Sequence, residues 1–203
     1  MTSAGSSLRV AAMCFVALAA ALPAAAQDFP RSEFSAGYQM LRLSVDGESE
    51  TLGKGWYVDV ASNINRMFGG VFEVGGSYKS LTETTTSGGF TGTATADFKI
   101  HEIMGGLRVN SRGNPNVVPF AQVLAGLIHG SASATVTAGT TGSPVFSDSF
   151  EDSGSNFGLQ IGGGVNMAMT RRLGLRVGVD YLRVFEEGGG GNAFRFGAGV
   201  VVH

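Results

Sequence analysis

The sequence predicts an all-β protein: an eight-stranded antiparallel up-and-down transmembrane β-barrel that follows a cleaved signal peptide. Three observations support this prediction. Eight segments alternate between apolar and polar residues, the connections between them are alternately short and long, and the chain begins with an apolar leader. Alternation with a period of two gives each strand an apolar face and a polar face. In a membrane barrel the apolar face contacts lipid and the polar face lines the interior.

The leader has the order of parts found in a secretory signal. Arg9 supplies the positive charge, residues 10–22 form the apolar run VAAMCFVALAAAL, and residues 24–26 are small. This run is shorter than the about 20 residues that span a bilayer as a helix, which argues against a membrane anchor. We therefore expect a signal peptide over residues 1–26 and a single outer-membrane β-barrel domain over residues 27–203.

Composition excludes several classes of protein. The formal net charge is −2 and the basic residues are scattered, which excludes a nucleic-acid partner. The only cysteine, Cys14, lies in the leader, so the mature chain has no disulfide chemistry. No later segment has 18 consecutive apolar residues, as a membrane-spanning helix would require. The sequence indicates no cofactor and no metal site, because the histidines are dispersed.

The first four predicted strands are residues 33–43, 55–64, 70–79 and 98–110. In the second of these, Trp56 and Val58 oppose Tyr57 and Asp59, which gives one apolar and one polar face. The fourth breaks its own pattern, because Phe98 and Ile100 fall on the polar face. We expect a β-bulge or an interfacial strand end there.

The last four predicted strands are residues 118–130, 156–169, 173–185 and 193–203. The first of them is apolar on both faces, and Gln122 alone indicates which face turns inward. The strand 173–185 is the clearest, because Val177 and Val179 oppose Arg176 and Asp180. Eight is an even number of strands, as bacterial single-chain barrels require.

The connections alternate in length. Residues 65–69, 111–117 and 170–172 are short, whereas four others are long or rich in Gly, Ser, Thr and acidic residues: 44–54, 80–97, 131–155 and 186–192. All long connections then lie at one end of the sheet, as the external loops of a membrane barrel do. We expect the longest to be the main external contact surface, with three loop contact candidates: Val145, Phe146 and Phe150. These either anchor the loop on the rim or meet a partner.

Four stretches resemble a known family. They are GWYVDVASNINRMFGGVFEVGGSY, PFAQVLAGL, GLQIGGGVNM and RRLGLRVGVDYL. They are similar to the small eight-stranded outer-membrane β-barrels of Gram-negative bacteria, in particular stand-alone OmpA/OmpX-like barrel domains. The resemblance implies a monomer in the cell outer membrane, with outer-membrane lipids, lipopolysaccharide and the barrel assembly machinery as partners. A soluble sandwich or lipocalin also alternates. The signal, the one-sided loops and the aromatic residues near strand ends favour the membrane barrel: Trp56, Tyr78, Phe157, Tyr181 and Phe194.

The polar faces define the candidate functional residues. Six charged residues form the expected lumen polar network: Asp59, Glu73, Glu102, Arg108, Arg176 and Asp180. Five further polar residues are expected to face inward beside them: Asn63, Gln122, Gln160, Asn166 and Arg195. An eight-stranded barrel has room for side chains alone, so the charges are expected to pair as a plug, with Asp180 against Arg176 or Arg108. The sequence thus favours a protein that is not an enzyme, with a closed polar lumen and a structural or surface-interaction role through extracellular loops and an unidentified ligand.

Two alternatives belong to other functional classes. His129 and Ser131 resemble the base and nucleophile of a lipid A-modifying outer-membrane hydrolase, but such catalysis also needs a group that orients the base. The nearest downstream acids are Asp148, Glu151 and Asp152. The second alternative is a small channel, if a path remains between the inward charges.

Overall fold

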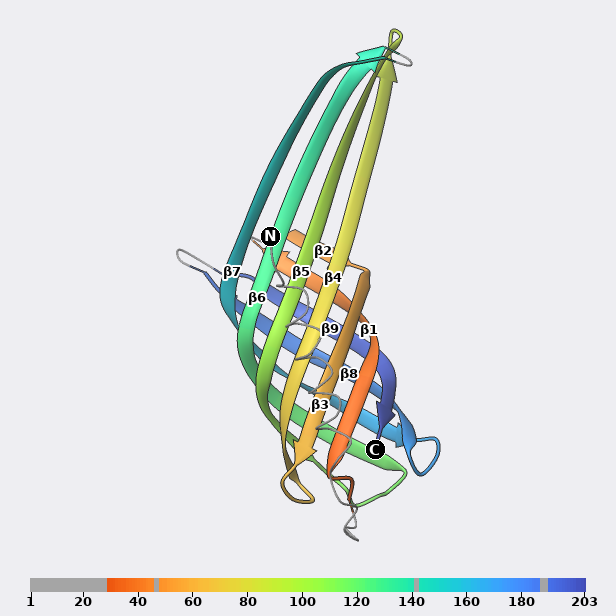
Figure 1. The fold of residues 1–203 in the computed structure, drawn as a ribbon, viewed down its shortest axis with the longest axis vertical. Helices are drawn as coiled ribbons and strands as arrows, with labels where there is room; N and C mark the ends of the chain where they lie inside the picture. The colour runs from red at the N-terminus through yellow and green to blue at the C-terminus, as the bar shows by residue number, and fades with distance from the viewer. Residues whose placement is uncertain (1–28, 46–47, 141–142, 187–189) are drawn as a thin grey trace, which may run out of the picture.

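The computed structural model describes residues 29–45, 48–140, 143–186 and 190–203. They form one antiparallel sheet that closes into a ring (Figure 1). Its strands are β1 (Ser32–Val45), β2 (Glu48–Leu52), β3 (Lys54–Asn63), β4 (Phe68–Ser87), β5 (Phe90–Asn110), β6 (Val117–Thr140), β7 (Ser143–Ala168), β8 (Leu173–Phe185) and β9 (Asn192–Val202). The predicted signal peptide lies outside the described residues. No helix in the described part is long and apolar enough to span a bilayer.

The ring contains the eight strands that the sequence predicts. Each strand pairs with the next along the chain, and β9 closes the ring on β1 through residues 34–44. Only Gly53 separates β2 from β3, and the two pair with successive parts of β1. They therefore occupy a single position in the ring, and the predicted barrel architecture is confirmed.

Three short turns lie at one end of the ring, as predicted. Polar side chains bond the turn backbone and replace the ladder hydrogen bonds that are lost there. The Asn65 side-chain oxygen accepts hydrogen bonds from the backbone N–H groups of Met67 and Phe68, both 2.8 Å long. Thr170 accepts a similar bond of 3.1 Å from Leu173.

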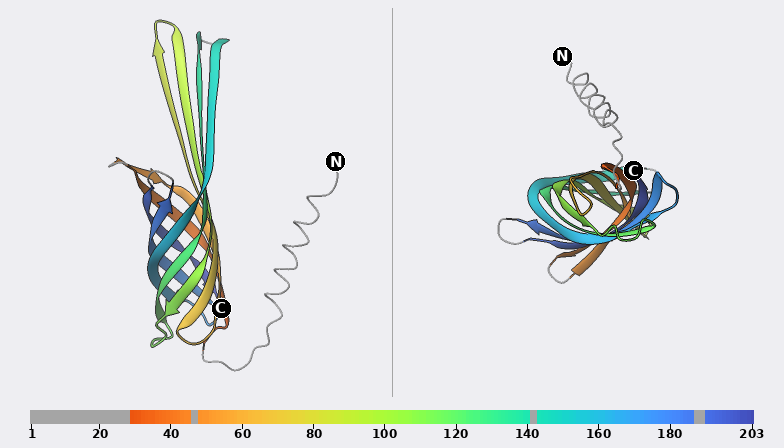
Figure 2. Two further views of the ribbon diagram at one scale, coloured as in Figure 1. Left: turned by 90° about the vertical axis from the view of Figure 1, so that its left-hand side faces the viewer. Right: turned by 90° about the horizontal axis from the view of Figure 1, so that it is seen from below.

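The opposite end corrects the prediction of long loops at residues 80–97 and 131–155. There β4, β5, β6 and β7 continue as strands and rise far beyond the other strands (Figures 1 and 2). We call this part the extension: residues 79–87, 90–98, 132–140 and 143–152. At its tip Gly88 and Gly89 have φ angles of 59° and 84°, the left-handed pair required by a two-residue hairpin turn. Threonine pairs connect the hairpin strands, for example Thr84 and Thr93.

The strand neither bulges nor ends at Phe98 and Ile100, so the expected β-bulge or strand end is wrong. β5 pairs in unbroken register with both neighbours at these positions. The inner face, which continues the barrel interior, instead changes from polar to apolar along the strand. Glu102 is buried in the barrel, Ile100 packs against an apolar cluster, and Phe98 begins the extension. A register shift does occur between β6 and β7, at Ala138 and Gly139 of β6.

Candidate functional site

The barrel interior contains two groups of buried ion pairs, both built from inward positions of the strands. The first surrounds Asp59 on β3. One oxygen of its carboxylate lies 3.2 Å from Arg108, and the other lies 2.6 Å from Arg176. Both guanidinium groups also lie about 5 Å from the ring of Phe120, at 4.9 and 5.0 Å from its centroid. This arrangement pairs each buried charge and places an aromatic face against the cations.

The second group surrounds Arg195 on β9. Its guanidinium contacts the carboxylates of Glu73, Glu102 and Asp180, at 2.5, 3.2 and 2.8 Å. The Arg195 side chain is 4% exposed, so water contributes little to its solvation. Three carboxylates therefore depend on a single arginine. Removing that arginine would leave all three buried without their main counter-charge.

Amide side chains join the two groups into one network. Gln122 accepts hydrogen bonds from Arg108 in the first group and donates to Asp180 in the second, at 3.1 Å. Gln39 donates to Glu102 at 2.8 Å. The network is thus continuous across the barrel, because Gln122 contacts charged residues of both groups.

The structure places all six residues of the expected lumen network inside the barrel and brings them together. It also brings in Arg195, which was expected to face inward, and three residues that sequence reasoning left out: Glu33, Gln39 and Arg112. Glu33 and Gln39 lie on the polar face of the predicted strand 33–43, opposite its apolar residues, and this was the available signal. Arg112 lies in a predicted turn, so alternation gave no reason to turn its side chain inward.

Most of an apolar cluster lies on the side of the network that faces the extension, whereas its members Ala61 and Val71 lie next to Asp59 and Glu73 toward the short turns. On β1 Leu41 follows Gln39, and on β8 Leu182 follows Asp180. The cluster's larger members within the described residues are Leu41, Leu52, Met104, Leu124, Ile128 and Leu182, with Leu43, Ile100 and Val184 packed against it. These side chains explain why the segment 118–130 is apolar on both faces: its inward residues include Leu124 and Ile128.

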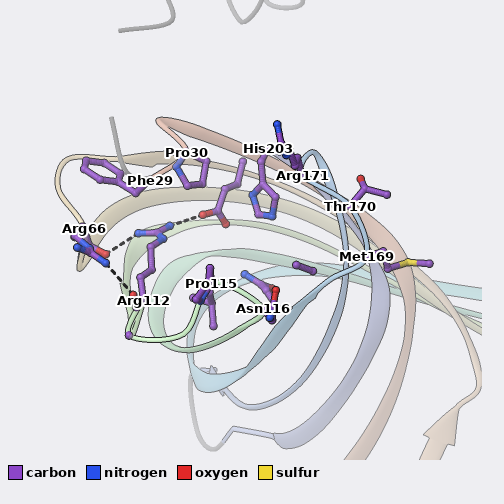
Figure 3. Close-up of a pocket in the computed structure, with 15 residues that line it drawn as sticks. Phe29, Pro30, Arg66, Arg112, Pro115, Asn116, Met169, Thr170, Arg171 and His203 are labelled. Atoms are coloured by element: carbon purple, nitrogen blue, oxygen red, sulfur yellow. Dashed lines mark hydrogen bonds and ion pairs between the residues drawn. The ribbon is translucent and has the colours of Figure 1, made fainter. Parts of the chain in front are cut away.

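A cavity of about 900 Å³ opens at the short-turn end of the barrel (Figure 3). Arg112 reaches across it to Glu33, and Arg66 and Arg112 each donate a hydrogen bond to the backbone carbonyl of the other. His203 lines the same cavity, and burial lowers the pKa of its imidazole. The cavity ends on the Glu33 carboxylate, which also pairs with Arg176 at 3.2 Å.

A hydrogen-bonded belt runs along the outside of the barrel where the extension begins. Trp56 donates to the Tyr78 hydroxyl at 3.1 Å, and Tyr78 shares a hydrogen bond of 3.1 Å with His101. His129 pairs with His101 across the strands and shares a 2.9 Å hydrogen bond with Ser155. Amphipathic aromatic residues of this kind gather at membrane interfaces.

This belt accounts for the candidate catalytic histidine. His129 is hydrogen-bonded to Ser155 on the neighbouring strand and not to Ser131 on its own strand. Within the described ranges, no carboxylate hydrogen-bonds His129. The predicted His129 and Ser131 pair is therefore not assembled as a base and a nucleophile.

The predicted loop contact candidates lie on a strand and not in a loop. Phe146 and Phe150 belong to β7 within the extension, and their side chains are 56% and 66% exposed. They occupy alternate positions on the inner face of the extension. The placement of the Val145 side chain lies outside the described part of the chain.

Comparisons with known proteins agree with this geometry. A family model described as an outer membrane protein beta-barrel domain matches residues 11–203. Two similar solved structures are Ail, the attachment invasion locus protein of Yersinia pestis, in complex with the heparin analogue sucrose octasulfate, and Neisserial surface protein A. They are 19% and 17% identical, with TM-scores of 0.54 and 0.55. The alignments cover 84% and 85% of this chain and 97% of each neighbour. At these identities the likeness shows a shared fold. No curated protein matches.

Proposed function

Because the chain belongs to the outer membrane protein β-barrel domain family and lies in the cell outer membrane, we propose that it is a surface-interaction protein whose barrel anchors and presents the extension. Strand length is the observation that carries this proposal. A strand needs about 9 to 11 residues to cross a bilayer, whereas β7 has 26 and β4 has 20. About half of each long strand is thus available outside the membrane, on the side of the longer connections.

The same proposal includes a closed polar lumen. The Arg195 and Asp59 groups occupy the interior with paired charges, and the apolar cluster packs beside them toward the extension. A permeating ion would have to displace buried, hydrogen-bonded ion pairs, which is costly. This argues against the channel alternative, and the bonding of His129 to Ser155 argues against the hydrolase.

Outer-membrane lipids and lipopolysaccharide are the proposed partners of the belt. Lys54, Tyr78 and Lys99 form one row of strand partners that lies beside the row of His101 and His129. Cationic and aromatic side chains suit the anionic headgroups of an outer leaflet. Residues 1–26 are proposed to be the signal peptide that directs the chain to this membrane.

The extension is poorly suited to bind an anionic ligand such as the sucrose octasulfate bound by Ail. Two acidic residues, Asp97 and Glu151, lie on its outer face, and Glu83, Asp148 and Asp152 lie on its inner face. Lys79 is its only basic residue. A sulfated sugar would therefore meet repulsion, and a protein surface is the better candidate partner.

The test compares the full protein with a truncated barrel. Asn-Gly turns replace residues 82–95 and 135–149, so the cuts fall at the cross-strand pairs of Leu81 with Ala96 and of Ala134 with Phe150. We expect both proteins to insert into the membrane, and each should migrate differently on gels before and after heating. Cells that display the full protein should adhere to protein-coated surfaces or clump, and cells with the truncated barrel should not. Equal behaviour of the two would contradict the surface role, and a steady conductance of the full protein in planar bilayers would contradict the closed lumen.

A further inference from the structure

The inner face of the extension is an exposed apolar surface. Its two central strands present mainly small residues, with Val136 in the middle of the face and Phe90 and Phe98 at its ends. The other large apolar residues lie on the flanking strands: Leu81, Phe146 and Phe150. Each of these six side chains is at least 40% exposed. The outer face of the same strands carries serine and threonine almost throughout, for example Thr84, Thr93 and Ser133. A sheet with one apolar and one polar face normally buries the apolar one.

We propose that a second copy of this chain, displayed on an opposing membrane, covers this face: the two extensions pack face to face with antiparallel strands. The proposal rests on the proposed surface role and names its partner. It joins two cells through a sandwich of two four-stranded sheets.

The arrangement of large side chains on the face is self-complementary. A twofold axis across the strands at the row of Glu83, Ala94, Val136 and Asp148 places each strand opposite its own copy. Phe98 and Phe90 are four residues from Ala94 in opposite directions, so Phe98 of one copy meets Phe90 of the other.

The same relation holds on β7. Phe150 and Phe146 lie two residues on either side of Asp148, and each meets the other across the interface. Val136 lies on the axis and faces itself. The four aromatic residues therefore meet in matched pairs, and the small residues Gly92 and Ala96 of β5 face one another, whereas Leu81 faces Thr85.

The face is large enough for a specific contact. Nine residues of β4, from Lys79 to Ser87, span about 30 Å, and four strands span about 19 Å. Two extensions packed face to face would then bury roughly 1,100 Å² in total. A biological interface is expected to bury at least about 1,000 Å².

The position of the barrel selects the antiparallel arrangement. The extension rises from one side of the ring, and its inner face overlooks the barrel's own mouth (Figure 2). Two copies in one membrane would have to place both barrels beneath the same interface, where they would overlap. Antiparallel strands place the barrels at opposite ends. Each membrane therefore holds single barrels, and the pair forms only between membranes.

Charges at the two flanks of the face make the pairing depend on salt. Glu83 on β4 and Asp148 on β7 lie in the axial row, so each faces its own copy. Other inner-face charges lie nearer the barrel: Lys79, which contacts Glu50, and Asp152. Because like charges repel, added salt should strengthen the pairing.

The first experiment measures tethering of vesicles that carry the full-length protein. Light scattering should rise when protein-bearing phosphatidylcholine vesicles are mixed, and rise more as salt is added. Ala134→Asp on the inner face should reduce tethering about tenfold, because it buries an unpaired charge. Thr135→Asp adds the same charge at the next position, on the outer face, and should leave tethering unchanged. Heat-modifiable migration on gels confirms that each variant is folded.

The second experiment determines strand direction by cross-linking in a Cys14→Ser background. With a short bifunctional maleimide, Phe98→Cys should cross-link to Phe90→Cys on a second vesicle and not to itself. A parallel arrangement would instead join Phe98→Cys to Ala132→Cys, because these positions share a row.

Three results would overturn the proposal. The first is a failure of wild-type vesicles to tether, and the second is an equal effect of Ala134→Asp and Thr135→Asp. The third is capture of bare vesicles by protein-bearing vesicles, which would assign the face to a lipid surface. If cells that display the full protein adhere to protein-coated surfaces but do not clump with one another, the second copy is the wrong partner and the surface role stands.

Discussion

The extension consists of four strands that also form part of the barrel, yet the faces of these strands have opposite polarity in the two regions. On β5 the inward residues of the barrel include Glu102 and Arg108, whereas those of the extension include Ala94 and Phe98. On the outside the order is reversed, from Ile103 in the barrel to Thr93 in the extension. Apolar and polar residues alternate along the whole strand, but the apolar residues change from the outer face to the inner face. The alternation therefore identifies the strand, and the face that carries the apolar residues identifies the medium on each side.

The inversion occurs at one level on the outside of the four long strands. Gly76, His101, His129 and Ser155 are successive strand partners in a single row. Below this row the outward residues are apolar, such as Leu127 and Phe157, and above it, beyond Tyr78, most are serine, threonine or charged. A lipid boundary would produce this change, because outward side chains meet hydrocarbon on one side of it and water on the other.

The strongest test of the barrel half of this comparison is Arg195→Met. It keeps the length of the side chain but leaves Glu73, Glu102 and Asp180 without their guanidinium. We expect a loss of about 3 to 5 kcal/mol in the free energy of unfolding, because buried charges lose their partner. Urea unfolding measures this loss, with the folded fraction determined from mobility on gels. Arg183→Met is the matched control, since Arg183 bonds Asn192 at the partly exposed rim, and it should cost less than about 1 kcal/mol. Similar losses in both variants would mean that water solvates the Arg195 group.

The second test places one charge on the outward face of each region. Val177→Arg faces lipid and should cost about 2 to 4 kcal/mol if it lies near the bilayer midplane. Thr135→Arg has the same outward orientation in the extension, where we expect a change within about 0.5 kcal/mol. Insertion into vesicles followed by urea titration compares the two. Equal losses would place the extension in lipid, and equal tolerance would remove Val177 from the lipid-facing surface.

The sequence predicted the barrel half well and the extension poorly. Strands such as 173–185 alternate strongly because lipid and paired charges lie on opposite sides, and Arg176 and Asp180 are buried as expected. In the extension the outer face is almost all serine and threonine and much of the inner face is glycine and alanine, so these segments resemble loops in composition. The available signal was the Gly88 and Gly89 pair between alternating threonines, which predicts a two-residue hairpin. Phe98 was interpreted as a β-bulge or an interfacial strand end, because the sequence does not show that the strand continues beyond the membrane with its apolar and polar faces exchanged.

The third test concerns a partner that the sequence could not identify. Asp180 was expected to pair with Arg176 or Arg108, but it contacts Arg195 and Gln122 instead. Because Arg195 keeps Glu73 and Glu102, Asp180→Ala should cost less than Arg195→Met, about 1 to 3 kcal/mol. Urea unfolding measures it, with Asp97→Ala on the outer face of the extension as a neutral control. Unchanged urea resistance of Asp180→Ala would indicate that the lumen charges are hydrated.

The smallest expected effect tests whether the extension is a folded hairpin. Gly88→Ala adds a Cβ atom at a φ of 59°, where it meets no neighbouring atom, so any loss comes from the backbone alone. A left-handed residue other than glycine costs about 1 to 2 kcal/mol. Gly92→Ala also meets open space, but it lies within β5 and should be neutral or slightly stabilising, since alanine has less freedom than glycine to lose. Because the turn lies far from the barrel, global urea unfolding should not change in either variant. Amide hydrogen exchange should accelerate at the tips of β4 and β5 in Gly88→Ala only. Rapid exchange of these amides in the wild type would mean that residues 80–97 form the loop that their composition suggested.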